Sequence, residues 1–168
     1  MIQVYTGDGK GKTTAALGQA LRASGHGMRV MVIQFMKAGG YYGESLAAPG
    51  VEGLEIRSFG RMEFVDRDNP SEEDKELAAR GIAFARKCLD SGAYDLMVLD
   101  ELNVAVDFGL IPLTDALNLL ERGGDTEIIV TGRGAPAEFT RMANLVSEIR
   151  EIKHPFREGI SARKGFDY

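Results

Sequence analysis

Short apolar segments alternate along the whole chain with segments in which apolar residues recur at helical spacing. The run Arg29–Phe35 is almost continuously apolar, which is typical of a strand buried on both faces of a parallel sheet. The predicted strands are residues 2–6, 29–35, 54–59, 95–99, 127–131 and 145–152. The predicted helices are residues 13–23, 71–89, 112–121 and 136–143. This alternation predicts an α/β domain with a mostly parallel central sheet and helices on both faces.

The length and composition describe an ordinary globular domain. The chain has 168 residues, 44% of them apolar, and carries no internal repeat or interdomain linker, so we expect one domain over residues 1–168. The net charge of −5 argues against nucleic acid as the main partner, because phosphate neutralisation needs a basic face. The first residues lead straight into a strand, and no apolar run reaches the roughly 18 residues of a membrane span. We therefore expect a cytoplasmic protein with no membrane partner.

Glycine and lysine residues crowd the turn between the first strand and the first helix. The stretch reads Thr6-Gly7-Asp8-Gly9-Lys10-Gly11-Lys12-Thr13-Thr14, and it fits the phosphate-binding pattern G-x-x-x-x-G-K-[ST] except that Thr6 replaces the first glycine. Glycines let successive backbone N–H groups face one anion, and the following helix directs its dipole at the same place. Lys12 adds a positive charge, and the Thr13 hydroxyl can bind Mg²⁺ between the phosphates. We expect an ATP site formed by Thr6–Thr14.

A second polar element follows the apolar strand at residues 95–99. Asp100 and Glu101 close this strand, where a phosphate-binding loop needs an acid to complete its metal site. Mg²⁺ prefers oxygen ligands and keeps several waters, so one or two carboxylates suffice. The two side chains point in different directions, and the pattern leaves open which one approaches the metal. Glu101 could also act as a base that activates water, as in many ATPases.

The remaining polar signals are weaker. Arg133 follows the strand at 127–131 and is a candidate ATP ligand, although it could equally pair with a surface carboxylate. His154 is more typical of a structural residue than of a catalytic one. Tyr41, Tyr42 and the segment 59–64 could line a large planar ligand or merely cover the sheet edge. No histidine or cysteine cluster suggests a transition-metal site.

Several strings in order along the chain resemble one family. They are Thr6–Ala16, Gly25–Gly27, Val32–Lys37, Val98–Asn103, Thr131–Pro136, Lys153–Phe156 and Gly165–Tyr168. Together they are similar to the corrinoid adenosyltransferases of the P-loop type, which act on cob(I)alamin or cob(I)yrinic acid a,c-diamide. The resemblance implies a three-layer P-loop NTPase (RecA-like) fold and a homodimer.

The resemblance also implies an activity. Such enzymes transfer the 5′-deoxyadenosyl group of ATP to the Co(I) centre of a reduced corrinoid and release triphosphate, in adenosylcobalamin biosynthesis or salvage. Co(I) is itself a strong nucleophile, so the protein must supply alignment and charge neutralisation rather than a base. Lys12 and Glu101 are the expected catalytic residues, Thr13, Asp100 and Glu101 the expected Mg²⁺ ligands, and an electron-donating reductase the expected partner.

Two departures from the family pattern concern the corrinoid side of the site. Some members place a Phe and a Trp two residues apart to displace the lower axial cobalt ligand, but this chain has no tryptophan. Phe59 and Phe64 are the candidates for that role. Some members also carry a segment before the first strand that caps the partner's site, whereas this chain begins with the strand.

Two other functions compete with adenosyl transfer. A small P-loop ATPase or kinase would act at the γ-phosphate, and a nucleotide-binding regulatory protein would use ATP to control a partner. A kinase lid needs several arginines, whereas the stretch between Glu101 and Glu127 holds only Arg122. The sequence leaves open which corrinoid is the natural acceptor.

Overall fold

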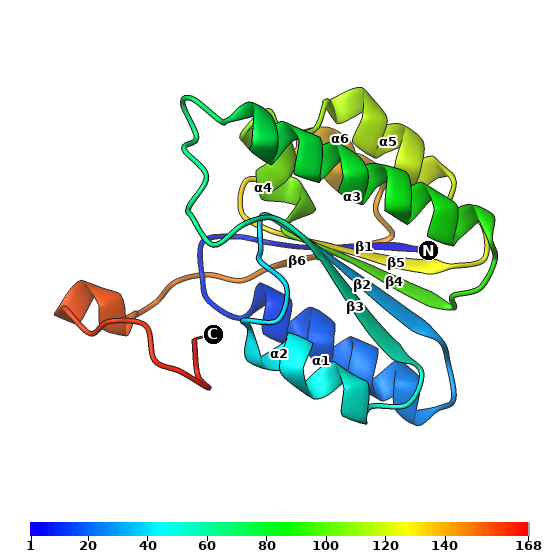
Figure 1. Ribbon diagram of the computed structural model, residues 1–168, viewed down its shortest axis with the longest axis horizontal. Coiled ribbons are helices and arrows are strands. Elements are labelled where there is room, and N and C mark those ends of the chain that lie inside the picture. Colours follow the sequence, from blue (N-terminus) through cyan, green and yellow to red (C-terminus); the bar gives the residue numbers. More distant parts are fainter. Residues whose placement is uncertain (168) are drawn as a thin grey trace.

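A single parallel sheet forms the centre of the protein (Figure 1). The computed structural model describes residues 1–167, and Tyr168, the last residue of the expected C-terminal motif, lies outside them. The six strands stand in the order β3-β2-β4-β5-β1-β6, and all five pairings are parallel. The strands are β1 (Ile2–Thr6), β2 (Val30–Phe35), β3 (Leu54–Phe59), β4 (Leu96–Asp100), β5 (Glu127–Thr131) and β6 (Leu145–Glu148). The predicted α/β class with a mostly parallel sheet is confirmed.

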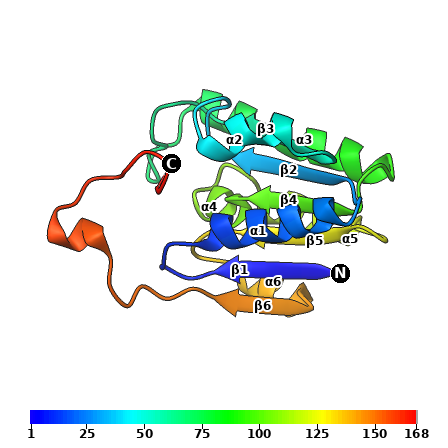
Figure 2. The same cartoon turned by 90° about the horizontal axis from the view of Figure 1, so that it is seen from below.

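Helices cover both faces of the sheet, so the molecule has three layers (Figures 1 and 2). The helices are α1 (Lys12–Gly25), α2 (Gly43–Ala47), α3 (Glu72–Asp90), α4 (Leu102–Asp107), α5 (Leu113–Glu121) and α6 (Ala137–Met142), with 3-10 turns η1 (Ala48–Gly50) and η2 (Pro155–Glu158). Helices α1 and α2 lie on one side, and α3, α4, α5 and α6 lie on the other. No helix among the described residues is long and apolar enough to cross a membrane.

The two faces of the strands bury separate apolar clusters. Along β2, Met31 and Ile33 pack into the larger cluster beneath α3, α4, α5 and α6, while Val30 and Val32 pack against α1. Successive strand side chains point to opposite faces, so a continuously apolar strand serves both clusters. This is why β2, β4 and most of β5 are buried along their length.

The longest helix begins where the sequence indicates. The Ser71 hydroxyl accepts a hydrogen bond from the Asp74 N–H at 3.2 Å, and the Asp74 carboxylate accepts one from the Ser71 N–H at 3.2 Å. This reciprocal capping satisfies two backbone donors that a helix start otherwise leaves unpaired. The predicted start at Ser71 is confirmed, with Ser71 as the capping residue.

Four short elements, α2, η1, α4 and η2, were not predicted, and β6 is shorter than expected. Helices α2 and α4 have only 5 and 6 residues, too few for a helical period to show in the sequence. The turn η2 lies in the tail that we expected to be irregular. Strand β6 ends at Glu148 instead of residue 152, because its partner β1 ends at Thr6 and gives way to the phosphate-binding loop.

Candidate functional site

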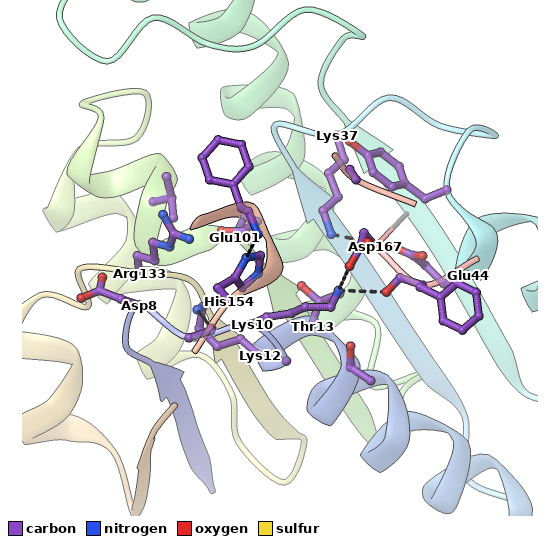
Figure 3. A pocket seen from close by; sticks show the side chains of 18 of the residues that line it. Asp8, Lys10, Lys12, Thr13, Lys37, Glu44, Glu101, Arg133, His154 and Asp167 are labelled. Carbon is purple, nitrogen blue, oxygen red and sulfur yellow. Dashed lines mark hydrogen bonds and ion pairs between the residues drawn. The ribbon is translucent and has the colours of Figure 1, made fainter. Parts of the chain in front are cut away.

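The carboxyl ends of the parallel strands meet at one edge of the sheet, where a cleft of about 1160 Å³ opens. The cleft is lined by the loop after β1, the start of α1, the segment before α2, one side of α4, the loop after β5 and the C-terminal tail. Figure 3 shows Lys12, Glu101 and Arg133 reaching toward it from three different elements. Ligands of open α/β sheets bind at this edge.

The phosphate-binding loop, residues 7–11, lies against the chain that follows β6. The Gly9 N–H donates to the Ile149 carbonyl at 2.7 Å, and a Cβ added at Gly9 would lie 2.7 Å from the Arg150 carbonyl oxygen. No other residue fits there without displacing backbone. Gly11, with φ of 122°, then turns the chain into α1, whose first N–H groups have no side-chain cap. Uncapped N–H groups at the start of a 14-residue helix are suited to an anion.

Lys12 is buried inside this loop. Its Nζ donates to the carbonyl oxygens of Gly7 and Gly9, each at 2.6 Å. Burial lowers the pKa of the Lys12 ammonium, and the Glu101 carboxylate acts in the opposite direction. The loop therefore holds its cation with neutral carbonyls, which leaves the charge available to an anion.

Asp100 lies behind the cleft and is fully buried. One oxygen, Oδ1, accepts hydrogen bonds from the hydroxyls of Thr13 at 2.8 Å and Thr131 at 2.7 Å. The other, Oδ2, faces Lys37 at 2.7 Å and the amide of Gln34 at 3.5 Å. Asp100 therefore joins the first turn of α1 to the ends of β2 and β5.

Glu101, in contrast, lines the cleft. Its backbone has the left-handed φ of 63°, uncommon for a residue with a side chain, and its N–H donates to Thr131 Oγ1 at 3.0 Å. Desolvation raises the pKa of the Glu101 carboxyl above its ordinary value, and the Asp100 charge raises it further. Strained backbone and a perturbed acid in a cleft are typical of functional sites.

Lys37 and Glu44 form a part of the site that the sequence did not single out. Lys37 Nζ contacts Asp100 and lies 3.8 Å from Glu44 Oε1 and 5.3 Å from the Tyr42 ring centroid. Burial lowers the pKa of Lys37, but the Asp100, Glu101 and Glu44 carboxylates outweigh it, so the pKa is raised. The one signal in the sequence was a lysine directly after an apolar strand.

The other expected ATP ligands fall into two groups. Those that line the cleft are Asp8, Gly9, Lys10, Gly11, Thr14 and Arg133. Thr6 and Gly7 do not line it, and the Thr6 hydroxyl accepts from the Ala135 N–H at 3.3 Å. Lys10 binds the tail, because its Nζ lies 2.9 Å from the Phe166 carbonyl oxygen and 2.9 Å from Asp167. The tail brings His154 and Phe166 to the cleft as well.

The aromatic candidates for the corrinoid do not line the cleft. Phe59 packs against the larger apolar cluster, with its ring centroid 5.6 Å from that of Phe84. Phe64 is fully exposed on the loop after β3. Arg61 fixes the base of that loop, because its guanidinium donates to both oxygens of Asp74, at 2.7 and 3.0 Å.

The sequence and fold were compared with known proteins. The sequence model of the family described as ATP:corrinoid adenosyltransferase BtuR/CobO/CobP matches residues 1–168. A corrinoid adenosyltransferase of Escherichia coli K12 is 39% identical, over all of this chain and 85% of that protein. A Salmonella typhimurium corrinoid adenosyltransferase is also 39% identical, with the same coverage.

An uncharacterized protein of Nostoc is 38% identical over 99% of this chain, which spans only 48% of that protein. Among solved structures, a KaiC-like protein from Pyrococcus horikoshii has a similar fold, with a TM-score of 0.57 and 15% identity. The similarity extends over 90% of this chain and 73% of that protein. That likeness shows the fold alone, and it agrees with the expected P-loop architecture. The full-length match of the sequence shows that the chain belongs to the ATP:corrinoid adenosyltransferase family.

Proposed function

We propose that this chain transfers the 5′-deoxyadenosyl group of ATP to the Co(I) centre of a reduced corrinoid and releases triphosphate. The observation that carries the proposal is the pairing of a phosphate-binding loop with a cleft of about 1160 Å³ at the same sheet edge, in a chain of this family. Pockets for one drug-sized ligand measure roughly 300–1000 Å³. The cleft is therefore large enough to hold ATP.

The reaction needs no proton transfer. The electron pair of Co(I) forms the bond to C5′ of ATP, the C5′–O bond breaks, and its electron pair leaves with the triphosphate. Lys12, the N–H groups at the start of α1 and Arg133 would hold the triphosphate and neutralise its charge. Their task is to hold C5′ in line with the cobalt.

The residues at the base of the loop fit Mg²⁺. Thr13 and Glu101 bring a hydroxyl and a carboxylate to the cleft, and Asp100 lies directly behind Thr13. These are oxygen donors, and Mg²⁺ usually binds through one or two carboxylates together with waters and substrate phosphates. When bound, Mg²⁺ would offset the negative charge of the triphosphate. Thr13 and Glu101 would be ligands on the cleft side, and Asp100 would be the carboxylate ligand behind them.

The remaining parts of the proposal concern partners. A homodimer is implied by the resemblance to the family, and the edge strand β6, on which Leu145 and Val146 are exposed, would offer it a surface. A reductase that supplies electrons to cobalt, and a cytoplasmic location, follow from the chemistry of the family and remain predictions.

An anaerobic assay with ATP, Mg²⁺ and chemically reduced cob(I)alamin tests the proposal. The expected products are light-sensitive adenosylcobalamin and an equal amount of triphosphate. Several corrinoid acceptors should be compared, because the natural one is not fixed by the chain. Orthophosphate release without any change in corrinoid absorbance would instead support a P-loop ATPase with Glu101 as base.

A further inference from the structure

The Lys37 ammonium is the counter-ion of the buried Asp100 carboxylate. It lies 2.7 Å from Asp100 Oδ2, and the Lys37 side chain is only 15% exposed. Because the two hydroxyl donors fill Oδ1, both oxygens of Asp100 already have partners. The buried carboxylate thus carries an internal counter-ion before any ligand arrives.

A divalent cation near Thr13 would meet this ammonium. Thr13 and Lys37 bind opposite oxygens of the same carboxylate, so an ion that approached Asp100 beside Thr13 would lie within a few ångströms of Lys37. Two unscreened positive charges at such a distance repel strongly in a buried site. Lys37 therefore disfavours the metal for as long as its ammonium stays on Asp100.

The backbone around Lys37 is tightly packed, whereas the Lys37 side chain is long and flexible. Met36 has the left-handed φ of 60°. A Cβ added at Gly60 would lie 2.3 Å from the backbone nitrogen of Lys37, so the turn after β2 packs tightly against the end of β3. The four-carbon stem of a lysine, in contrast, lets its charge pivot between neighbouring anions. Lys37 lines the same cleft as the phosphate-binding loop, where a triphosphate would compete with Asp100 for it.

We propose that Lys37 holds the cation position of Asp100 until a triphosphate draws its ammonium away, which makes metal binding at this site dependent on the nucleotide. The inference rests on the proposed function in taking triphosphate and Mg²⁺ as the ligands. The metal would replace the ammonium on Asp100 while the ammonium neutralises phosphate. Loss of the triphosphate would return Lys37 to Asp100 and expel the ion.

Metal binding to the nucleotide-free protein tests the first half of this proposal. Mn²⁺, which shares the oxygen preference of Mg²⁺, is titrated and its free signal followed by electron paramagnetic resonance. We expect weak binding to the wild type, and on the order of tenfold tighter binding to Lys37→Gln, in line with typical coupling between sites. The glutamine amide keeps a hydrogen-bond donor near Asp100, although it reaches less far than the ammonium.

Two further variants separate this effect from general electrostatics. Lys10→Gln removes a cleft lysine that pairs with Asp167, and it should leave Mn²⁺ affinity within about twofold of the wild type. Lys37→Gln combined with Asp100→Asn should lose the gain. Unchanged Mn²⁺ affinity in Lys37→Gln, or the same gain in Lys10→Gln, would overturn the proposal.

The second half is tested by nuclear magnetic resonance of the lysine ammonium groups. The Lys37 signal, assigned from its loss in Lys37→Gln, should shift when inorganic tripolyphosphate is added without metal. A signal that stays unchanged at saturating tripolyphosphate would contradict the movement. No corrinoid is present in these experiments, so their outcome is independent of whether adenosyl transfer occurs.

Discussion

The hydroxyl of Thr131 lies between two neighbouring acids, because it donates to Asp100 Oδ1 at 2.7 Å and accepts from the Glu101 N–H at 3.0 Å. One side chain on β5 thereby orients the buried acid and fixes the left-handed backbone of the acid that lines the cleft. Replacing it affects both acids at once, although Thr131 itself does not line the cleft.

Thr131→Val should cost about 1–3 kcal/mol of unfolding free energy, because Asp100 loses a donor and the Glu101 N–H loses its acceptor. Adenosyl transfer should fall as well. Thr126→Val is the matched control, since its hydroxyl donates to the Tyr94 carbonyl at 3.0 Å at the other end of β5. Urea unfolding and turnover should show both variants destabilised and only Thr131→Val impaired at saturating substrate.

Lys12→Met should remove binding of ATP while leaving the protein folded. The ammonium is held by the carbonyls of Gly7 and Gly9, so its loss leaves no buried charge without a partner. We expect ATP affinity or turnover to fall on the order of 100-fold or more. Calorimetric titration with ATP measures this directly, with Lys75→Met on the exposed side of α3 as control. ATP affinity close to that of the wild type would contradict the assigned role.

Glu101→Gln should raise stability and lower activity. Desolvation raises the pKa of the Glu101 carboxyl. Because ionising this carboxyl is unfavourable in the folded protein, the free energy of unfolding falls as pH rises from about 4.5 through the folded-state pKa. The amide avoids that cost near neutral pH and makes no difference at lower pH, where both states are protonated. Thermal unfolding across this range checks the sign. A variant less stable than the wild type near neutral pH would refute it.

Much of the site could be predicted from the sequence. The parts that could not be predicted have one cause in common. The pair Asp100–Glu101 was located because an acid after a buried strand has few other uses near a phosphate-binding loop. Lys37 comes two residues after the end of β2, and a lysine there is equally common on a surface. Its burial depends on Gly60 and the packing of β3, which no local pattern encodes.

The tail illustrates the same limit at long range. Lys10 is expected to bind ATP, and it lines the cleft, but its contact with the Phe166 carbonyl, 156 residues further along the chain, could not be predicted. Contacts of that separation depend on the path of the chain over the whole fold. The sequence also leaves open the choice between Asp100 and Glu101, and in the structure Glu101 lines the cleft whereas Asp100 lies behind it.

Phe64→Ala should weaken corrinoid binding without affecting stability. Its ring is fully exposed on the loop after β3, so it contributes nothing to the core. If the loop folds onto the corrinoid, KM for the corrinoid should rise about two- to tenfold while KM for ATP stays unchanged. Phe59→Ala is the contrasting variant, because Phe59 packs with Phe84 and its loss should cost on the order of 2 kcal/mol of stability. Unchanged corrinoid kinetics in Phe64→Ala would remove it from the site.

The pair Arg61–Asp74 should give the protein an acid-sensitive stability. The Arg61 guanidinium lowers the pKa of the Asp74 carboxyl from 3.8 to about 2. The pair's contribution to the free energy of unfolding is therefore complete above pH 3.8 and is lost as the pH falls through about 2. Urea unfolding of Asp74→Asn should therefore show lower stability than the wild type near neutral pH. The gap should close as the pH approaches 2. A gap independent of pH would contradict the linkage.

The common direction of the strands separates the cleft from every turn at the opposite edge of the sheet. The turns that lead into β2, β3, β4 and β5, at residues 26–29, 51–53, 91–95 and 122–126, all lie away from the reacting groups. Asp125 is exposed in the last of them, and the one native cysteine, Cys88, is buried. A cysteine introduced at residue 125 would therefore be the only accessible thiol in the chain. A fluorophore or surface linker attached there would report on the protein, or immobilise it, with the cleft still open to solvent.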